Sequence, residues 1–168
     1  MNLEQAANLE QLYNRYKNQI YTLCLHLARD NDFAGELFSE TWVRVTEKFY
    51  QIKSEYNILN WIYTICLNIY RKKQRKINIL SFFGENDDFS NIKNENKNAE
   101  EIFIENETKS LLHKNINKLS DKYRIPLILF YFKELSYQQI AQTMKIPTST
   151  VKFRLNQAKN ILRQKMEN

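Results

Sequence analysis

Apolar residues recur every three or four positions along most of this chain, which is the spacing of one face of an α-helix. Three such stripes follow one another in the first part of the chain, separated by short polar stretches. Gly35 falls inside the second stripe and disfavours a helix, so the sequence predicts that this helix starts near it. The three stripes are Leu12, Tyr16, Ile20, Leu23 and Leu27; then Leu37, Phe38, Thr41, Trp42, Val45 and Phe49; then Leu59, Ile62, Tyr63, Cys66, Ile69 and Tyr70.

Two further amphipathic helices are predicted between about residue 101 and residue 131. The second of them is expected to start at Ser120-Asp121. Pro126 is expected to kink or delay this helix, because proline cannot donate a backbone hydrogen bond. The apolar positions are Ile102, Leu111, Leu112 and Ile116 in the first helix, and Ile125, Leu127, Ile128, Phe130 and Tyr131 in the second.

Residues 135–165 have the pattern of a helix-turn-helix, two short helices joined at a sharp turn. Ser136 and Gln139 stand at the spacing of a capping box, which favours a helix start at this point. Pro147 ends the first of the two helices, because proline biases the residue before it away from helical backbone.

The second of these helices is predicted to carry a basic outer face. Thr148 or Ser149 is expected to cap it. Between Leu135 and Met166 there is no acidic residue, against six lysines and arginines. An uncompensated positive face suits a phosphate backbone, and a second helix presented at a sharp turn can enter a DNA major groove. The positions predicted to point inward are Val151, Leu155, Ala158 and Leu162.

Charge is unevenly distributed over the 168 residues. The chain has a formal net charge of +6, whereas residues 81–107 contain eight acidic residues and two lysines and so carry −6. The remaining parts together therefore carry about +12. Residues 78–100 are rich in Asn, Asp and Glu and lack helical periodicity, which is typical of a linker. The sequence thus predicts an all-α protein in which two small helical domains, an N-terminal helical bundle (1–77) and a C-terminal helix-turn-helix domain (101–168), are joined by an acidic flexible linker.

The composition argues against several other classes of protein. Only two glycines occur, whereas dinucleotide-binding folds and phosphate-binding loops need glycine at their turns. No apolar run approaches the roughly 20 residues of a membrane span, and no signal peptide is visible, so a cytoplasmic protein without membrane insertion is expected. Cys24 and Cys66 lie in apolar stripes and, with His26 and His113, lack the spacing of metal ligands. No metal, cofactor or catalytic residue is predicted, because no cluster of carboxylates or histidine-based pair is present.

The chain resembles the extracytoplasmic-function (ECF) class of bacterial RNA polymerase sigma factors in three segments: LFSETWVRVTEKF, WIYTICLNIYRKKQRK and LSYQQIAQTMKIPTSTVKFRLNQAK. These small factors keep only regions two and four of the sigma-70 family. The resemblance implies that residues 1–77 form region two and residues 101–168 form region four. It also implies a transcription initiation factor, not an enzyme, that binds the β′ clamp helices and the β flap of core RNA polymerase, binds promoter DNA, and is held by an anti-sigma factor.

A polymerase-contact helix is implied around residues 36–45. Docking on a helical partner needs exposed charges and a few apolar anchors on one face. An acidic pair usually stands where this chain has Gly35-Glu36, so one carboxylate is missing. Without the resemblance, these charges would be interpreted as ordinary solvated helix positions. The implied polymerase-binding residues are Glu36, Phe38, Glu40, Thr41 and Arg44.

A second implied site reads and melts the minus-ten promoter element. Factors of this class extrude a base of the non-template strand, and stacking and edge hydrogen bonds repay the cost of unstacking. Asn60 and Asn68 are the favoured contacts, since Trp61 can also be interpreted as a core residue. The run from Arg71 to Lys76 has five positive charges in six residues and suits phosphates around the melted strand. The implied residues are Tyr56, Asn57, Asn60, Trp61, Asn68, Arg71, Lys72, Lys73, Arg75 and Lys76.

The last helix is implied to lie in the major groove of the minus-thirty-five element. Asparagine and glutamine can pair with adenine, phenylalanine can pack on a thymine methyl group, and arginine and lysine can hold phosphates. Many relatives have a glycine where Lys145 stands and a small residue where Phe153 stands. The implied base readers are Lys152, Phe153, Asn156 and Gln157; the implied phosphate contacts are Arg154, Lys159 and Arg163, with Thr148, Ser149 and Thr150 at the helix start.

One alternative function stays open from the sequence. A freestanding helix-turn-helix regulator would use the N-terminal block as a dimerisation or sensing module. Such a module should show a ligand cavity or coiled-coil heptads, whereas this block shows a basic aromatic helix and no heptad. The sigma factor is therefore the favoured hypothesis.

Overall fold

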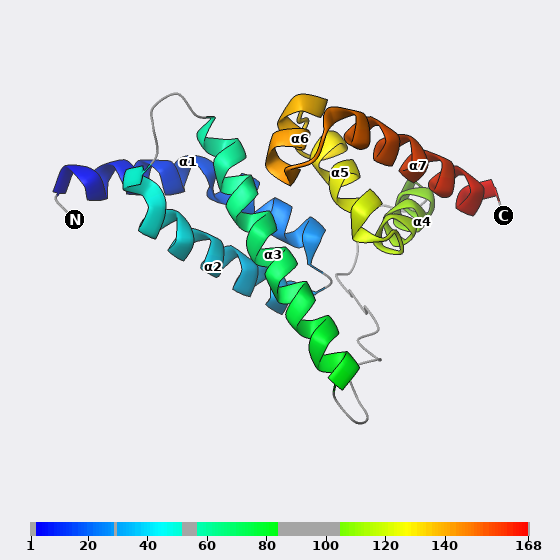
Figure 1. Cartoon of the computed structure of the whole chain (residues 1–168), viewed down its shortest axis with the longest axis horizontal. Coiled ribbons are helices and arrows are strands. Elements are labelled where there is room, and N and C mark those ends of the chain that lie inside the picture. Colours follow the sequence, from blue (N-terminus) through cyan, green and yellow to red (C-terminus); the bar gives the residue numbers. More distant parts are fainter. Residues whose placement is uncertain (1–2, 29, 52–56, 84–104, 168) are drawn as a thin grey trace. The chain divides into compact units, whose positions relative to one another are not determined.

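The computed structural model of this chain describes residues 3–28, 30–51, 57–83 and 105–167 (Figure 1). All regular structure in these ranges is helical, which confirms the all-α prediction. The chain divides into two compact units, Met1–Glu95 and Asn96–Asn168. Most of the predicted linker and Tyr56 lie outside the described residues.

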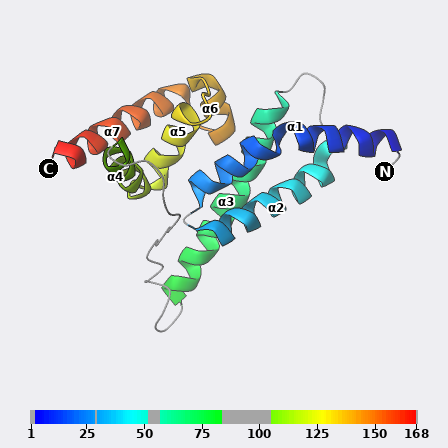
Figure 2. The ribbon, with the colours of Figure 1, turned by 180° about the vertical axis from the view of Figure 1, so that it is seen from behind.

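The first unit consists of the helices α1 (Leu3–Leu27), α2 (Asn31–Lys48) and α3 (Ile58–Phe83), with the short 3-10 helix η1 (Phe49–Gln51) after α2. Each of the three α-helices packs against the other two. The last turns of α3 project past α1 and α2 in both views (Figures 1 and 2). The predicted apolar stripes supply the core, in which the fully buried side chains include Ile20, Leu23, Leu27, Leu37, Val45, Ile62 and Cys66.

Helix α2 begins before Gly35 rather than near it. The Asp30 carboxylate accepts a hydrogen bond from the Phe33 backbone N–H at 2.7 Å, so Asp30 caps the helix. Gly35 lies inside α2, and no atom stands within 4 Å of the place where a Cβ would be. The predicted start was wrong because a good cap and a continuing apolar face outweigh the cost of one glycine, about 1 kcal/mol.

The two cysteines lie side by side in the core of this unit. Cys24 of α1 and Cys66 of α3 are fully buried thiols that form no disulfide, and their Sγ atoms lie 3.7 Å apart. They pack as the small apolar side chains that the sequence predicted. Tyr63 of α3 is 2% exposed, and its burial, with a smaller contribution from the charge of Cys66, raises the pKa of the Tyr63 hydroxyl to about 12.

Helix α3 continues through Phe83, into the segment from residue 78 that the sequence assigned to the linker. Each further helical residue adds a backbone hydrogen bond at little entropic cost once a helix exists. Residues 58–83 contain no glycine and no proline, the two residues that most disfavour a helix, so nothing in the sequence of α3 ends it earlier. The expected start of the linker is corrected by this observation.

The second unit consists of α4 (Glu105–Asn117), α5 (Asp121–Tyr131), α6 (Tyr137–Met144) and α7 (Thr148–Glu167). The first three of these helices all pack against α7, and α5 also packs against α6. Leu111 and Tyr131, predicted on apolar faces, are 47% and 51% exposed. None of the described helices of either unit is long and apolar enough to cross a membrane.

Helix α5 starts at Asp121 as predicted and runs through Pro126 without interruption. Proline removes only the hydrogen bond to the carbonyl of Lys122, which lies near the helix start on an exposed residue. The Arg124 side chain, 2% exposed, donates from Nε and Nη2 to Asp121 Oδ1 at 3.1 and 2.9 Å. This contact and the burial of Pro126 hold the first turns of α5, so the expected delay at the proline is wrong.

Candidate DNA and polymerase interfaces

The start of the helix-turn-helix is held by the predicted capping box. The Gln139 backbone N–H donates to Ser136 Oγ at 3.2 Å, and the Ser136 backbone N–H donates to Gln139 Oε1 at 2.8 Å. Two of the four backbone N–H groups that a helix start leaves unpaired are therefore satisfied by side chains.

The turn between α6 and α7 depends on Lys145. This residue ends α6 in the left-handed conformation, with φ 55° and ψ 48°. The Lys145 and Ile146 backbone N–H groups donate to the carbonyls of Gln142 and Ala141 at 3.3 and 3.0 Å. A left-handed residue at a helix end is most often glycine, so Lys145 adopts a backbone conformation that a residue with a Cβ rarely takes.

Helix α7 begins one residue earlier than a cap at Thr148 would place it, and two residues earlier than a cap at Ser149 would. The Val151 backbone N–H donates to the Pro147 carbonyl at 3.1 Å, and Thr148 is already helical. Pro147 therefore stands at the cap position, and the expected cap at Thr148 or Ser149 is wrong. Proline is well suited to a helix start because it has no N–H group to leave unpaired.

The two faces of α7 are separated as the sequence predicted. Val151, Leu155, Ala158 and Leu162 are buried against the other helices. Phe153, at 58% exposed, is the most exposed aromatic side chain of this unit's described residues. Of the predicted DNA contacts on α7, the exposed ones are Ser149, Lys152, Phe153, Asn156, Lys159 and Arg163, and the half-buried ones are Thr148, Thr150, Arg154 and Gln157.

Two tyrosines that the sequence did not single out for this site stand beside α7. Lys152 Nζ lies 6.0 Å from the ring centre of Tyr137, and Lys159 Nζ lies 5.8 Å from that of Tyr131. These distances are within the range of a cation–π contact. Both tyrosines belong to predicted helices, but only the packing of α5 and α6 on α7 brings their rings to these lysines.

The start of α3 gives Asn57 a structural contact. Asn57 Oδ1 accepts a hydrogen bond from the Asn60 backbone N–H at 3.2 Å, which is the geometry of a helix cap. The Asn57 carbonyl accepts from the Trp61 N–H at 3.1 Å. Asn60 Oδ1 is buried and has no hydrogen-bond partner among the described residues. Of these two predicted minus-ten contacts, only Asn60 thus holds a side-chain acceptor without a partner.

The outer face of α3 brings together most of the predicted minus-ten residues. Asn68 follows Trp61 by seven positions and Arg75 follows Asn68 by seven, so the three lie on one side of the helix. Trp61 is half-buried, while Asn68 and Arg75 are exposed. Arg71 is half-buried one turn from Arg75, and Lys72 and Lys76 are exposed.

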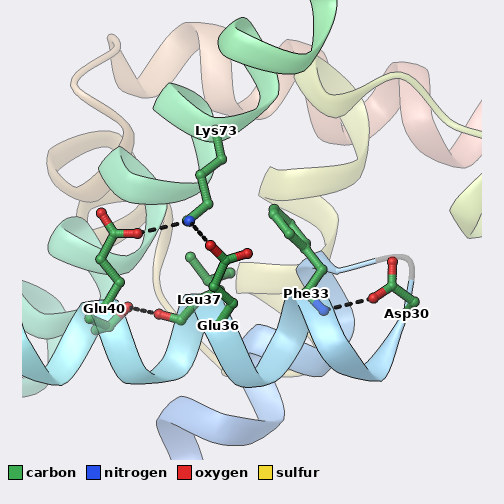
Figure 3. Close-up of polar contacts among 7 residues, drawn as sticks. Asp30, Phe33, Glu36, Leu37, Glu40 and Lys73 are labelled. Atoms are coloured by element: carbon green, nitrogen blue, oxygen red, sulfur yellow. Dashed lines mark hydrogen bonds and ion pairs between the residues drawn. The ribbon is translucent and has the colours of Figure 1, made fainter. Parts of the chain in front are cut away.

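Lys73 departs from the rest of this basic run. Its Nζ lies 2.7 Å from Glu36 Oε1 and 2.9 Å from Glu40 Oε2, both on α2 (Figure 3). Burial lowers the pKa of the Lys73 ammonium, and the hydrogen bonds and charges of the two glutamates raise it more, so the net pKa is raised. The predicted phosphate contact at Lys73 is corrected by this geometry, because its ammonium is already held by two carboxylates.

On α2, the predicted polymerase contacts fall on different sides of the helix. Thr41 is fully buried, and its Oγ1 donates to the Leu37 carbonyl at 2.7 Å, so it cannot contact a partner and is removed from the predicted set. Phe38 is half-buried, with its ring centre 5.4 Å from that of Tyr21. Arg44 is exposed and pairs with Glu47 at 2.8 Å. Glu36, Glu40 and Arg44 thus form the accessible charged part of this site.

Trp42, which the sequence placed in the core, has a buried indole N–H without a hydrogen-bond acceptor among the described residues. The side chain is 8% exposed, and its ring lies 4.8 Å from Tyr13 of α1. Among the described residues there is also no group of three His, Cys, Asp or Glu side chains that could hold a metal ion.

Comparison with protein families and curated sequences points to one kind of protein. The family described as sigma-70, region 4, matches residues 109–162. The ECF RNA polymerase sigma factor SigW of Bacillus subtilis is 26% identical over 158 residues, which cover 90% of this chain and 84% of SigW. The ECF sigma factor SigM of the same organism is 24% identical over 159 residues, covering 92% of this chain and 93% of SigM.

Solved structures share the fold. The sigma factor RpoE in complex with the anti-sigma factor NepR from Bartonella quintana matches with a TM-score of 0.72 at 19% identity, over 95% of this chain and 97% of RpoE. CnrH in complex with the cytosolic domain of CnrY matches with a TM-score of 0.66 at 14% identity, over 95% of this chain and 87% of the other.

Proposed function

This chain belongs to the extracytoplasmic-function group of the sigma-70 family, and from this premise we propose how it specifies promoters. As a sigma factor it is a non-enzymatic transcription initiation factor that directs core RNA polymerase to promoters. The residues that perform each step are proposals from the geometry of the two units. The N-terminal helical unit serves as region two and the C-terminal unit as region four.

The observation that carries the proposal is the outer face of α7. It presents amide, aromatic and basic side chains without one acidic residue before Glu167, on the second helix of a helix-turn-helix. Such a helix fits the major groove, where amides pair with adenine and phenylalanine packs on thymine methyl groups. Asn156, Gln157 and Phe153 read bases of the minus-thirty-five element in this proposal. Lys152, whose ammonium lies 6.0 Å from the ring centre of Tyr137, binds a phosphate in this proposal, since lysine is a common phosphate ligand.

The outer face of α3 supplies the second DNA contact. Asn60 and Asn68 carry the amides that can bind an extruded base of the minus-ten element, and Trp61 offers a ring for stacking. Arg75 and Lys76 are exposed on the C-terminal half of α3. Positive charges placed there can follow the phosphates of the melted strand.

Core polymerase is the proposed partner of α2. Glu36, Glu40 and Arg44 present charge at one-turn spacing, which suits a helical partner such as the β′ clamp helices. A contact of the C-terminal unit with the β flap belongs to the same proposal. Because polymerase and promoter are cytoplasmic, the chain acts in the cytoplasm.

An anti-sigma factor is a further proposed partner. The structures of RpoE and CnrH share this fold; RpoE was solved in complex with the anti-sigma factor NepR, and CnrH in complex with the cytosolic domain of CnrY. By analogy, a protein that covers the polymerase-binding or DNA-binding faces would keep this chain inactive.

The test is transcription in vitro with bacterial core polymerase on a pooled promoter library, with and without the purified chain. New transcripts from a subset of promoters that share two spaced elements are expected. A chain that binds duplex DNA alone, and yields no transcript with core polymerase, would instead act as a freestanding regulator and would overturn the proposal.

A further inference from the structure

Lys73 differs from its neighbours in the direction in which it leaves α3. Successive residues of an α-helix are turned by about 100°, so Lys72 and Lys73 point to different sides. Lys72 is exposed, whereas the Lys73 side chain is 20% exposed. Ile69 and Tyr70, one turn before Lys73, are buried. Lys73 therefore continues the side of α3 that packs on the other helices, not the outer face.

The partners of Lys73 lie on the charged face of α2. Glu36 and Glu40 are one turn apart and share that face. Figure 3 shows the Lys73 ammonium between the two carboxylates, with one dashed contact to each. Charge-assisted hydrogen bonds are short and directional, so one ammonium sets both the separation and the rotation of α2 against α3 at this level.

The two carboxylates also need this cation. Like charges at one-turn spacing on a helix repel one another, and the Glu36 and Glu40 side chains are 63% and 35% exposed. Removing the ammonium leaves both carboxylates without this partner and frees their rotamers. The arrangement of the charged face of α2 then depends on Lys73, a residue of the neighbouring helix.

We propose that Lys73 is a positioning residue that holds the polymerase-binding face of α2 and the promoter-binding face of α3 in one arrangement, and that it is not itself a phosphate contact. The inference rests on the proposed function of these two faces. Asn68, Lys72, Arg75 and Lys76 meet the promoter directly; Lys73 acts through Glu36 and Glu40.

The experiment compares the same substitution at two adjacent lysines. Holoenzyme is assembled from core polymerase and saturating Lys73→Met, Lys72→Met or wild-type chain, and its affinity for promoter DNA is measured across a salt series. Loss of one phosphate contact lowers the slope of log affinity against log salt by about 0.9 for duplex DNA, or about 0.7 for a single strand. We expect this smaller slope for Lys72→Met. For Lys73→Met we expect the wild-type slope and an affinity several-fold lower at every salt concentration.

A third variant tests whether the ion pairs carry the effect. Lys73→Arg keeps the positive charge and can contact both carboxylates, so it should restore most of the affinity lost in Lys73→Met. A residue that only filled space between the helices would be replaced as well by methionine as by arginine.

Two results would overturn the inference: a slope for Lys73→Met as low as that of Lys72→Met, or an affinity equal to that of wild type at every salt concentration. If wild-type holoenzyme forms no promoter complex at all, the proposed function fails instead. The contact is then tested in the free chain by the thermal midpoints of Lys73→Met, Glu40→Gln and the double variant. A double variant that loses less than the sum of the singles supports the contact, and strictly additive losses refute it.

Discussion

Individual side chains in this protein have tasks that their residue type alone does not reveal. Thr41 stands on the proposed polymerase helix but bonds to the backbone of its own helix in the core. Asn57 was predicted to bind DNA, and its side chain caps α3. Lys73 has the same charge as its neighbours in the sequence, but its ammonium is paired with two carboxylates of α2. In each case the neighbours supplied by another turn or another helix decide the role.

The buried hydroxyl of Tyr63 predicts a loss of stability in alkali. Above pH 10 an unfolded tyrosine releases its proton, whereas Tyr63 in the folded chain keeps it until about pH 12. The folded state then binds more protons than the unfolded state, so the free energy of unfolding falls as pH rises, by up to roughly 2 kcal/mol. The raised pKa of Lys73 acts in the same direction, because its stabilising contribution is lost as pH rises through that value.

Urea unfolding of the Tyr63→Phe variant between neutral pH and pH 12 isolates this contribution. The variant should show a shallower fall than wild type. Tyr21→Phe, which changes a tyrosine that is 41% exposed, is the matched control and should keep the wild-type fall. An identical pH dependence in all three proteins would contradict the assignment to Tyr63.

The left-handed backbone at Lys145 predicts a stabilising substitution. The Lys145 side chain is exposed, and its Cβ costs roughly 1–2 kcal/mol at positive φ. Lys145→Gly should therefore raise the free energy of unfolding, by about 0.5–1 kcal/mol after the extra freedom of glycine in the unfolded chain is counted. Chemical denaturation followed by circular dichroism measures the change.

Lys145→Ala separates backbone strain from charge in this experiment. Alanine removes the same ammonium but keeps the Cβ, so it should give no gain. Equal stabilisation by glycine and alanine would show that charge repulsion, not the left-handed conformation, is relieved.

At the scale of the element, helix faces explain which predictions succeeded. The capping box before α6 and the inward stripe of α7 depend on residues close in sequence, and both are confirmed. The outer face of α3 is likewise set by periodicity, since positions seven apart return to the same side. An apolar stripe does not show which neighbouring element lies against each face of a helix. The contacts of Tyr137 with Lys152 and of Tyr131 with Lys159 are examples, because they depend on how α5 and α6 pack on α7.

The outer face of α7 leads to a prediction about which base pairs of the promoter the protein distinguishes. Gln157→Ala should lose preference at one base pair of the minus-thirty-five element, by about 1–3 kcal/mol, because an amide can bind a base edge through two hydrogen bonds. Binding of holoenzyme to a set of single-base promoter variants measures this loss.

The same substitution two turns further along, Gln164→Ala, is the control, since Gln164 was not predicted to read a base. It should leave the pattern of preference unchanged. If Gln157→Ala weakens binding to all variants equally, Gln157 contacts the DNA backbone and reads no base.

At the scale of the whole molecule, charge is divided among segments. The chain is +6 overall, residues 81–107 carry −6, and the remainder therefore carries about +12. Acidic residues joined covalently to basic DNA-binding units compete with phosphate for the same cations and weaken binding that is not specific to sequence.

This division predicts opposite effects of two sets of substitutions. Replacing Glu85, Asp87, Asp88 and Glu95 with their amides should raise the affinity of the free chain for random duplex DNA several-fold at low salt. Replacing Lys93 and Lys97 with glutamine should lower it. Both effects should fade as salt rises, because screening weakens interactions beyond about 10 Å at 0.1 M salt. A fluorescence anisotropy titration measures the affinity of each variant for the DNA. If both variants change this affinity in the same direction, this account is contradicted.

The helical elements, the capping box, the inward faces and the resemblance to sigma factors could all be predicted from the sequence, because these features depend on spacing along one chain. The prediction erred at Gly35, at Pro126 and at the end of α3, where caps, burial or the absence of a breaker outweighed the preference of a single residue. That Lys73 pairs with the carboxylates of α2, and that Thr41 is buried, follows only from the packing of the helices. Periodicity shows that a helix has two faces, but only packing determines what each face meets.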